Sequence, residues 1–155
     1  MKGFNVRVYG ILIHDNKVLV SDEHIKGMNI TKLPGGGLEF GEGTIDCVIR
    51  EFKEELDLDI EVDSHFYTTD FFVNSAFSTN NQVISIYYTV KPKHSFEPSQ
   101  SGFKISHKPF DFEVKKEGAQ TMRWVELDKI SENDFTFIID KRIGEMLNNS
   151  WKQLF

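Results

Sequence analysis

Apolar and polar residues alternate with a period of two in several short stretches of the chain, and this period is typical of β-strands. In chain order the pattern predicts strands over residues 4–13, 17–21, 59–63, 66–73 and 82–90. The segment 14–17 combines His, Asp, Asn and Lys and predicts a tight turn between the first two strands. Residues 74–81 are rich in Asn and Ser and predict a second turn, whereas residues 22–32 lack periodicity and predict a loop.

Two other stretches show the period of an amphipathic helix. The first begins at Thr44 or Gly43 as N-cap and ends near Leu56, with Asp46 in the first turn, where the helix dipole favours a negative charge. Its predicted buried stripe consists of Ile45, Val48, Ile49, Phe52 and Leu56. The second helix is expected to begin at Asp134, and its buried stripe is predicted to hold Ile138 or Ile139, Ile143, Met146 and Leu147.

Between the last strongly periodic strand and the C-terminal helix the pattern is weaker. Residues 111–114 and the end of 118–126 predict short strands. The segment Lys91 to Lys108 contains Pro, Gly and several Ser residues and is too long for a routine connection. It is either a flexible surface loop or an insertion that faces a substrate. No repeat or linker interrupts the pattern, which predicts one α+β or α/β domain over residues 1–155.

Composition narrows the class of protein. The chain has 155 residues, of which 39% are hydrophobic and fourteen are Phe, and this content predicts a folded core and excludes general disorder. A net charge of −6 makes a nucleic-acid partner unlikely, because phosphate backbones are bound through Lys and Arg. The single cysteine, Cys47, cannot form an internal disulfide and fits a reducing compartment.

The sequence also gives expectations for the cellular location and the oligomeric state of the protein. We find no signal-peptide pattern after Met1 and no apolar run as long as a membrane span, so we expect a cytoplasmic protein without a membrane partner. The sequence is compatible with a homodimer.

The first helix carries the candidate chemistry. Glu51, Glu54 and Glu55 fall within an arc of about 100° on one face of the helix. Like charges at these spacings repel and destabilise a helix. Such a run is often only a solvated face, but few basic residues are interleaved here, and a divalent cation would relieve the repulsion. Carboxylate oxygens suit Mg²⁺ or Mn²⁺, which we therefore expect as the cofactor.

The glycines that precede this helix complete a recognisable pattern. The signature of the Nudix hydrolase family is Gly, five residues, Glu, seven residues, Arg-Glu, an apolar residue, any residue, Glu-Glu, any residue, Gly and an apolar residue. This chain resembles it closely, with the positions filled by Gly36, Glu42, Arg50, Glu51, Phe52, Glu54, Glu55 and Leu58. The one departure is Asp57, where the family most often has Gly. Asp tolerates the left-handed conformation that a helix end requires there.

The resemblance implies an α/β fold of the Nudix type, an α/β/α sandwich with a mixed β-sheet. It also implies a metal-dependent pyrophosphohydrolase that acts on a small-molecule nucleotide substrate, either a nucleoside diphosphate derivative or a nucleoside triphosphate. The implied metal ligands are Glu51, Glu54 and Glu55, with the backbone of Gly35. Arg50 is expected to orient the glutamates, Glu54 to take part in catalysis, and Glu42 to fix the loop.

Other roles are less closely specified by the residues. Gly36 and Gly37 are expected to let the substrate approach the backbone, and Phe71 and Phe72 to stack against it. The general base is open between Glu97, Glu113 and Glu117, and we favour Glu117 because it precedes the closing strand. Many relatives place substrate-binding arginines where this chain has Asp22, Glu23 and His24, so that part of the recognition is expected to differ.

Two alternative functions remain at this point. A module that binds or senses a nucleotide with weak catalysis would keep the fold, but it would have little need of the complete carboxylate set. A protein acting on capped RNA ends would need a basic surface, which the acidic balance disfavours. The sequence does not identify the leaving group.

Overall fold

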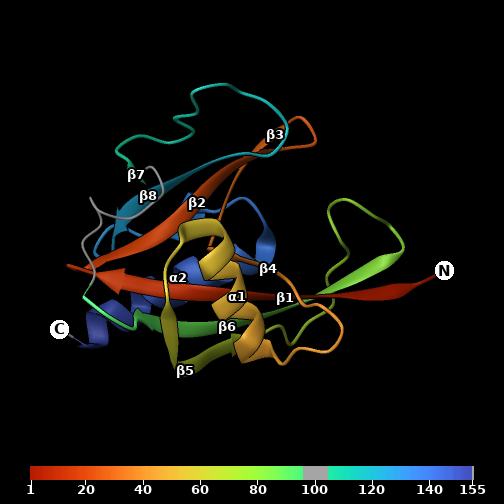
Figure 1. The fold of residues 1–155 in the computed structure, drawn as a ribbon, viewed down its shortest axis with the longest axis horizontal. Coiled ribbons are helices and arrows are strands. Elements are labelled where there is room, and N and C mark those ends of the chain that lie inside the picture. The colour runs from red at the N-terminus through yellow and green to blue at the C-terminus, as the bar shows by residue number, and fades with distance from the viewer. Residues whose placement is uncertain (96–104, 155) are drawn as a thin grey trace. The chain divides into compact units, whose positions relative to one another are not determined.

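The computed structural model describes residues 1–95 and 105–154, without the side chains of 150–154. The chain forms two compact units, one built from Met1–Ile11 and Pro34–Ser95, and the other from residues 12–33 and the described residues from 105 onward. Strand β1 (Gly3–His14) contributes residues to both units (Figure 1). Each unit is described separately below.

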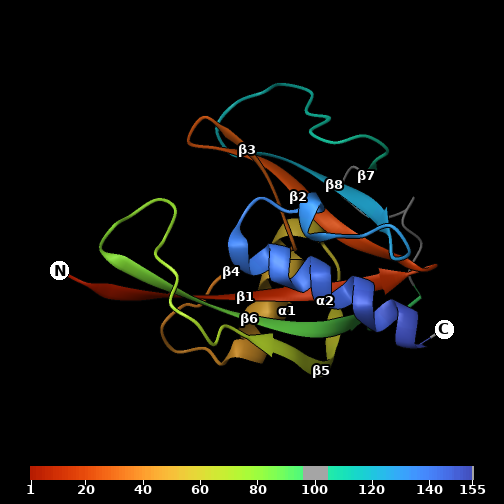
Figure 2. The ribbon, with the colours of Figure 1, turned by 180° about the vertical axis from the view of Figure 1, so that it is seen from behind.

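The first unit contains the beginning of β1, the short strand β4 (Gly35–Gly37), helix α1 (Thr44–Leu56), and strands β5 (Ile60–Thr68) and β6 (Asn81–Pro92). Strand β4 pairs antiparallel with β1, where Gly36 lies opposite Val8. Strands β5 and β6 form an antiparallel pair and lie side by side in Figure 2. Tyr9 and Tyr87 stack inside this unit with ring centroids 5.3 Å apart.

Strand β5 corrects two predictions at once. The predicted strands 59–63 and 66–73 are a single strand that ends at Thr68, and residues 69–73 are not part of a strand. The register with β6 shifts between Val62 and Ser64 and again between His65 and Tyr67. Such bulges interrupt the period of two, which explains why the sequence pattern divided one strand into two.

Helix α1 has the predicted bounds, with Gly43 as N-cap and Asp46 in the first turn. Its buried residues are Cys47, Val48, Phe52 and Leu56, whereas Ile45 and Ile49 are 47% and 36% exposed. The predicted buried stripe is therefore wrong for Ile45 and Ile49, and it omits Cys47. The helix contacts β4 and β5, and the thiol of Cys47 points at the carbonyl oxygens of Gly36 and Gly37, which rotates the buried face toward β4.

The C-terminal end of α1 confirms the prediction for Asp57. This residue has φ 48° and ψ 38°, in the left-handed region, and its N–H donates to the carbonyl of Lys53. Its carboxylate also lies 3.0 Å from the Lys53 ammonium, on an exposed surface. An exposed ion pair of this kind adds little to stability, because water and salt screen it.

The second unit contains the end of β1, strands β2 (Lys17–Ile25), β3 (Met28–Lys32), β7 (Ile105–Ser106) and β8 (Ala119–Glu126), a short 3₁₀ helix (Glu132–Asp134) and helix α2 (Ile138–Leu154). Strand β2 pairs antiparallel with β1, β3 and β8, and β7 pairs parallel with β8. The tight turn predicted at residues 14–17 is confirmed, since Asp15 and Asn16 both have positive φ.

The loop predicted over residues 22–32 is wrong. Strand β2 continues to Ile25, and a hairpin turn at Lys26 and Gly27, both with positive φ, leads directly into β3. Asp22, Glu23 and Lys32 are buried in these strands and are paired with other side chains. Ion pairs with other side chains offset the desolvation free energy of burying these charged residues, so the strand can continue through them.

The C-terminal predictions are confirmed in part. Helix α2 begins at Ile138 rather than Asp134, because Ser131 and Asp134 cap the preceding 3₁₀ turn and Phe135 is extended. Ile139, Ile143 and Leu147 are buried as predicted, whereas Ile138 is exposed and Met146 is half-buried. The strand predicted over 111–114 is wrong, since those residues are irregular and Phe110 before them has a φ of 55°.

The described residues thus form an α/β fold with a mixed sheet, as predicted, in which β7 and β8 form a parallel pair. A single domain over residues 1–155 stays a prediction. Among the described residues no helix is long and apolar enough to span a membrane.

The conformation of Asp57 generates a first testable prediction. Asp57→Gly removes the exposed ion pair but relieves the left-handed strain, so the free energy of unfolding should change by less than about 1 kcal/mol. Asp57→Ala loses the same pair and keeps a Cβ at positive φ, so it should be less stable than the Gly variant by about 1 kcal/mol. Urea unfolding of both variants, with Asp57→Asn as control for the lost charge, checks this. Equal stability of the Ala and Gly variants would contradict it.

Candidate active site

Arg50 of α1 is the centre of the acidic cluster in the first unit. Its Nε and Nη2 donate to the two oxygens of Glu42, at 3.0 and 2.7 Å. Its Nη1 donates to Glu51 at 3.0 Å and to Glu54 at 3.1 Å. Its Nη2 also reaches the carbonyl oxygen of Gly37 at 3.1 Å. One guanidinium therefore connects the helix, the preceding loop and strand β4. Its orienting role at the site stays a prediction.

Glu42 is the carboxylate most strongly held by this arrangement. The hydrogen bond from Arg50, assisted by the backbone N–H of Glu39 at 2.9 Å, lowers the pKa of Glu42 from 4.5 to about 2. The same pairing raises the pKa of Arg50 above its ordinary value. Glu42 thus holds the loop between β4 and α1 in place, as expected.

The glycines of β4 are required by close approach rather than by flexibility alone. At Gly36 an added Cβ would lie 2.5 Å from Glu51 Oε1, so any side chain there would displace this carboxylate. Gly35 has a φ of 147°, and an added Cβ would overlap the carbonyl oxygen of Val8. The N–H of Gly35 donates to Glu55 Oε2 at 3.3 Å. The structure therefore brings Gly35 beside Glu55 and Gly36 beside Glu51.

The three glutamates of α1 differ in exposure. The Glu51 side chain is only 13% exposed, Glu55 is half-buried, and the Glu54 side chain is 58% exposed. They do not form a simple solvated face, because Glu51 and Glu55 turn toward β4. Within the described part of the chain no group of three acidic, His or Cys side chains is already close enough together to hold a metal ion. The Arg50 guanidinium instead forms ion pairs with Glu51 and Glu54.

Cys47 lies beneath this cluster and is buried. Burial, with the nearby Glu42 carboxylate, raises the pKa of its thiol to about 12. The thiol is therefore protonated at neutral pH, and its Sγ lies 3.5 Å from the carbonyl oxygen of Gly37. Cys47 is therefore a small packing residue rather than a nucleophile.

The remaining predicted site residues lie outside this cluster. Phe71 is half-buried and Phe72 is exposed, both in the segment between β5 and β6. Glu117 belongs to the second unit, where its carboxylate accepts the N–H of Lys26 at 2.7 Å. Glu113 is exposed in the same unit, and Glu97 lies outside the described residues. Their roles stay predictions.

The sequence did not predict the buried polar network of the second unit. Lys32 Nζ lies 3.1 Å from Glu23 Oε2, which also accepts the hydroxyl of Ser21 and the amide of Gln120. The Asp22 carboxylate is fully buried and pairs with Arg123. The sequence feature that could have indicated these two paired strands is Gly27, which marks a two-residue hairpin turn between Ile25 and Met28.

Comparison with known proteins identifies the family to which the chain belongs. The NUDIX domain matches residues 4–143. The chain belongs to the NUDIX family. No curated protein sequence matches it significantly.

Solved structures share the fold at low sequence identity. A MutT NUDIX hydrolase from Burkholderia pseudomallei is 20% identical, with a TM-score of 0.61 over 91% of this chain and 95% of its own. MutT from methicillin-resistant Staphylococcus aureus is also 20% identical, with a TM-score of 0.61 over 97% and 99%. An ADP-ribose pyrophosphatase from Streptococcus suis is 19% identical, with a TM-score of 0.57 over 92% and 86%.

The lowered pKa of Glu42 generates a prediction for acid stability. Because its folded pKa is depressed, the Glu42–Arg50 pair stabilises the fold above about pH 4.5, and this contribution is lost as the pH falls toward about 2. Glu42→Gln should therefore be less stable than wild type at neutral pH, and the difference should shrink across this window. Urea unfolding midpoints along a pH series measure it.

Glu39→Gln is the matched control, since Glu39 is exposed and lies 3.7 Å from Arg50. Its stability should follow the wild-type pH profile closely. A constant difference between Glu42→Gln and wild type at every pH would show that Glu42 does not titrate with the depressed pKa.

Proposed function

We propose that this protein is a divalent-metal-dependent hydrolase that cleaves a pyrophosphate bond in a nucleoside diphosphate derivative or a nucleoside triphosphate. The observation that carries the proposal is the Arg50 network, which holds Glu42, Glu51 and Glu54 in one cluster beside the glycines of β4. Membership of the NUDIX family supports it, since the family consists generally of pyrophosphohydrolases and typically uses divalent metals. One structural neighbour is titled an ADP-ribose pyrophosphatase and another a UDP-X diphosphatase.

The donor set fits Mg²⁺ or Mn²⁺. Glu51, Glu54 and Glu55 offer hard carboxylate oxygens from one helix face, and Glu55 is already bonded to Gly35 on β4. These residues would hold the metal, with the carbonyl of Gly35 as a further ligand. When bound, the metal neutralises phosphate charge and lowers the pKa of coordinated water.

Arg50 has a positioning role in this proposal. It aligns Glu51 and Glu54 through hydrogen bonds, and its bidentate hold on Glu42 fixes the loop. Gly36 and Gly37 leave the backbone accessible to phosphate oxygens, and Phe71 and Phe72 offer rings for stacking. Glu117 is proposed as the general base, with Glu113 as the alternative.

The proposed activity predicts a dependence on divalent cations. Release of phosphate or nucleotide from a panel of nucleotide sugars, dinucleoside polyphosphates and nucleoside triphosphates should require Mg²⁺ or Mn²⁺ and stop in excess chelator. Glu54→Gln keeps the size but not the charge, so turnover should fall at least about a hundredfold. Because Glu54 is exposed, the melting temperature without metal should shift by at most about 3 °C.

Glu61→Gln is the matched control, because Glu61 is an exposed residue of β5 whose carboxylate lies 3.5 Å from the Lys91 ammonium. It should retain full activity. Turnover that persists in chelator, or full activity of Glu54→Gln, would contradict the proposal. Tight nucleotide binding without turnover under all these conditions would instead identify a binding or sensing module.

The positioning role of Arg50 predicts a separate effect. Arg50→Lys keeps the positive charge but cannot bridge Glu42, Glu51 and Glu54 together. Activity at limiting Mg²⁺ should fall about tenfold to a hundredfold, and the Mg²⁺ concentration needed for half-maximal rate should rise. A Mg²⁺ titration of the rate measures this. If the rate falls with an unchanged Mg²⁺ midpoint, Arg50 acts on the substrate rather than through the glutamates.

A further inference from the structure

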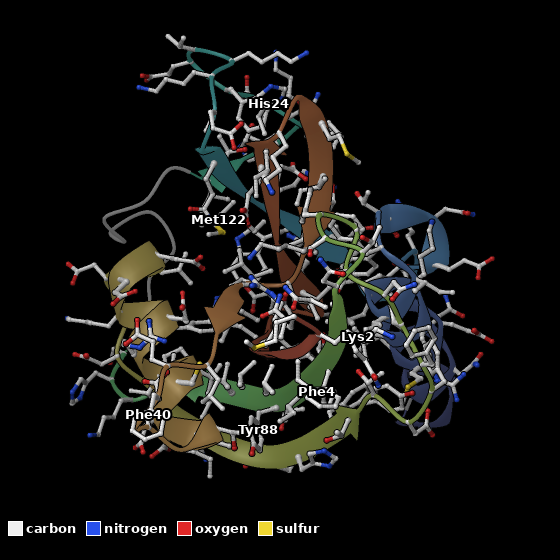
Figure 3. The ribbon with its side chains drawn as sticks, turned by 90° about the vertical axis from the view of Figure 1, so that its right-hand side faces the viewer. Lys2, Phe4, His24, Phe40, Tyr88 and Met122 are labelled. Atoms are coloured by element: carbon white, nitrogen blue, oxygen red, sulfur yellow. The ribbon has the colours of Figure 1, made fainter. Side chains whose placement is uncertain are left out.

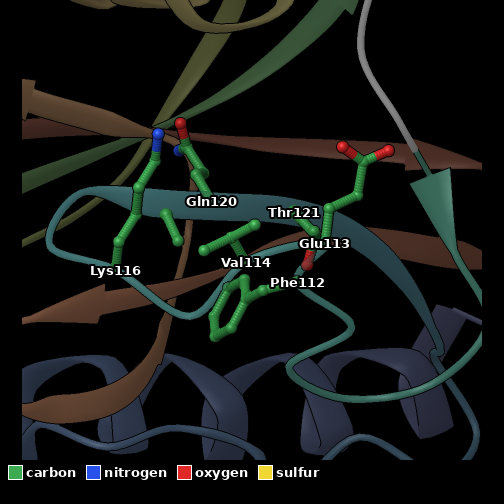
Figure 4. Close-up of a pocket in the computed structure, with 7 residues that line it drawn as sticks. Phe112, Glu113, Val114, Lys116, Gln120 and Thr121 are labelled. Atoms are coloured by element: carbon green, nitrogen blue, oxygen red, sulfur yellow. The ribbon is translucent and has the colours of Figure 1, made fainter.

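The second unit contains a pocket of about 340 Å³ that is lined by none of the residues proposed to hold the metal. It lies between strand β8 and the loop that precedes it, and Figure 4 shows the side chains around it. The lining residues are Phe112, Glu113, Val114, Lys116, Ala119, Gln120 and Thr121. A volume of this size is at the lower end of the range for small-molecule sites, about 300–1,000 Å³.

The wall of this pocket is anchored at its beginning by Asp22. The Asp22 carboxylate is fully buried and accepts two hydrogen bonds from Arg123, at 2.8 and 3.0 Å. It also accepts the hydroxyl of Thr31 at 2.7 Å and the N–H of Phe110 at 3.1 Å. The bond to Phe110 ties the loop to strand β2 just before the first lining residue.

The end of the loop is anchored as well. The Glu117 carboxylate accepts the N–H of Lys26, and the N–H of Gly118 donates to the carbonyl of His24 at 2.9 Å. Both ends of the loop are thus fixed to the β2–β3 hairpin. A pocket whose wall is held in this way needs little ordering when a ligand binds, which favours affinity.

Thr121 supplies the observation that points to a ligand. It is 5% exposed, lines the pocket, and its Oγ1 has no hydrogen-bond partner among the residues that the structure describes. Buried hydroxyls are nearly always paired, because desolvation without a partner is unfavourable. Thr31 lies opposite Asp22 on strand β3 and is 4% exposed, and its hydroxyl donates a hydrogen bond to Asp22. The unpaired hydroxyl of Thr121 is therefore available to a bound molecule.

The other lining groups restrict the chemistry of that molecule. Phe112 is half-buried with its ring 6.4 Å from that of His24, and with Val114 and Ala119 it offers an apolar surface suited to a flat ring. Lys116 and Glu113 contribute one charge of each sign, and Figure 4 shows them at opposite ends of the group in that view. The balanced charge disfavours a phosphate or another strong anion as the ligand.

We propose that this pocket binds a small, uncharged heteroaromatic ring of the nucleobase class, with the Thr121 hydroxyl bonded to a polar edge of the ring and Phe112 packed against its face. The ring can belong to a free base or to the base of a nucleotide. Binding here does not depend on the glutamates of α1, so it can be tested apart from hydrolysis.

The test is methyl NMR of the full chain in chelator, which prevents turnover. Adenine, cytosine and uracil are the probes for a free base, and adenosine and ADP-ribose are the probes for an attached one. At least one probe should shift the methyl signals of Val114, Ala119 and Thr121. Inorganic phosphate and toluene are the controls and should shift them weakly or not at all. Absence of any shift with all five probes, or an equal response to toluene, would overturn the proposal.

The comparison of free and attached bases identifies the source of the ring. Preference for the free bases indicates a site for the base itself, and preference for adenosine or ADP-ribose indicates a nucleotide site. Either preference supports the proposal. Glu54→Gln should bind the probe as well as wild type does, whatever its turnover, so that a failure of hydrolysis is distinguishable from a failure of binding.

Thr121→Val tests the role of the hydroxyl, with Thr31→Val as its matched control. Thr121→Val should weaken binding about tenfold, the effect of one lost hydrogen bond, while its melting temperature stays level or rises. Thr31→Val removes a paired hydroxyl and should melt at a lower temperature. Unchanged binding by Thr121→Val, or a fall in its melting temperature equal to that of Thr31→Val, would overturn the proposal.

Phe112→Leu provides an independent variant on the opposite side of the ligand. It keeps an apolar side chain but removes the ring, so binding of the same probe should weaken while inorganic phosphate still has no effect. Wild-type affinity in this variant would show that no ring packs there, which contradicts the proposal.

Discussion

The guanidinium of Arg50 is the interaction on which the first unit depends. Glu42, Glu51 and Glu54 all lie within hydrogen-bonding distance of it, and carboxylates so close together would repel one another without a shared cation. The planar fork of Arg can bond two oxygens of Glu42 on one side and two further carboxylates on the other, which a lysine ammonium cannot do with the same geometry. The network also explains why position 36 of β4 is glycine, since the absence of a side chain there allows Glu51 to approach the strand. The carbonyl of Gly37 accepts a further hydrogen bond from Arg50.

The second unit uses the same kind of pair for a different purpose. Asp22 and Arg123 form a bidentate pair in which the carboxylate is fully buried and has two further donors. Removing either partner would leave an uncompensated buried charge, so this pair fixes strand β2 and the loop before β8. Arg50 is partly exposed, and one of its partners, Glu54, reaches solvent. The Arg50–Glu54 contact is therefore open to solvent, whereas the Asp22–Arg123 pair is enclosed by the second unit.

The sequence was sufficient where one local rule determined the outcome. The bounds of α1, its N-cap at Gly43 and the left-handed Asp57 all follow from residues within the helix or next to it. Prediction failed where tertiary contacts decided. Ile45 and Ile49 have the spacing of a buried stripe, but the side chain of Cys47 faces β4 and leaves them exposed. Asp22 and Glu23 resemble loop residues until their partners Arg123 and Lys32 are known, and Arg123 is about a hundred positions away in the chain.

These pairings also bear on substrate recognition. The residues of the family signature, Gly36 to Leu58, lie wholly in the first unit. Where many relatives place substrate-binding arginines, this chain has Asp22 and Glu23, which lie within β2 and are engaged by partners in their own unit. Two carboxylates that are buried and paired cannot substitute for arginines that contact an anionic substrate. In the same unit the hydroxyl of Thr121 has no hydrogen-bond partner among the described residues, and the proposed ring site depends on this group rather than on the two carboxylates.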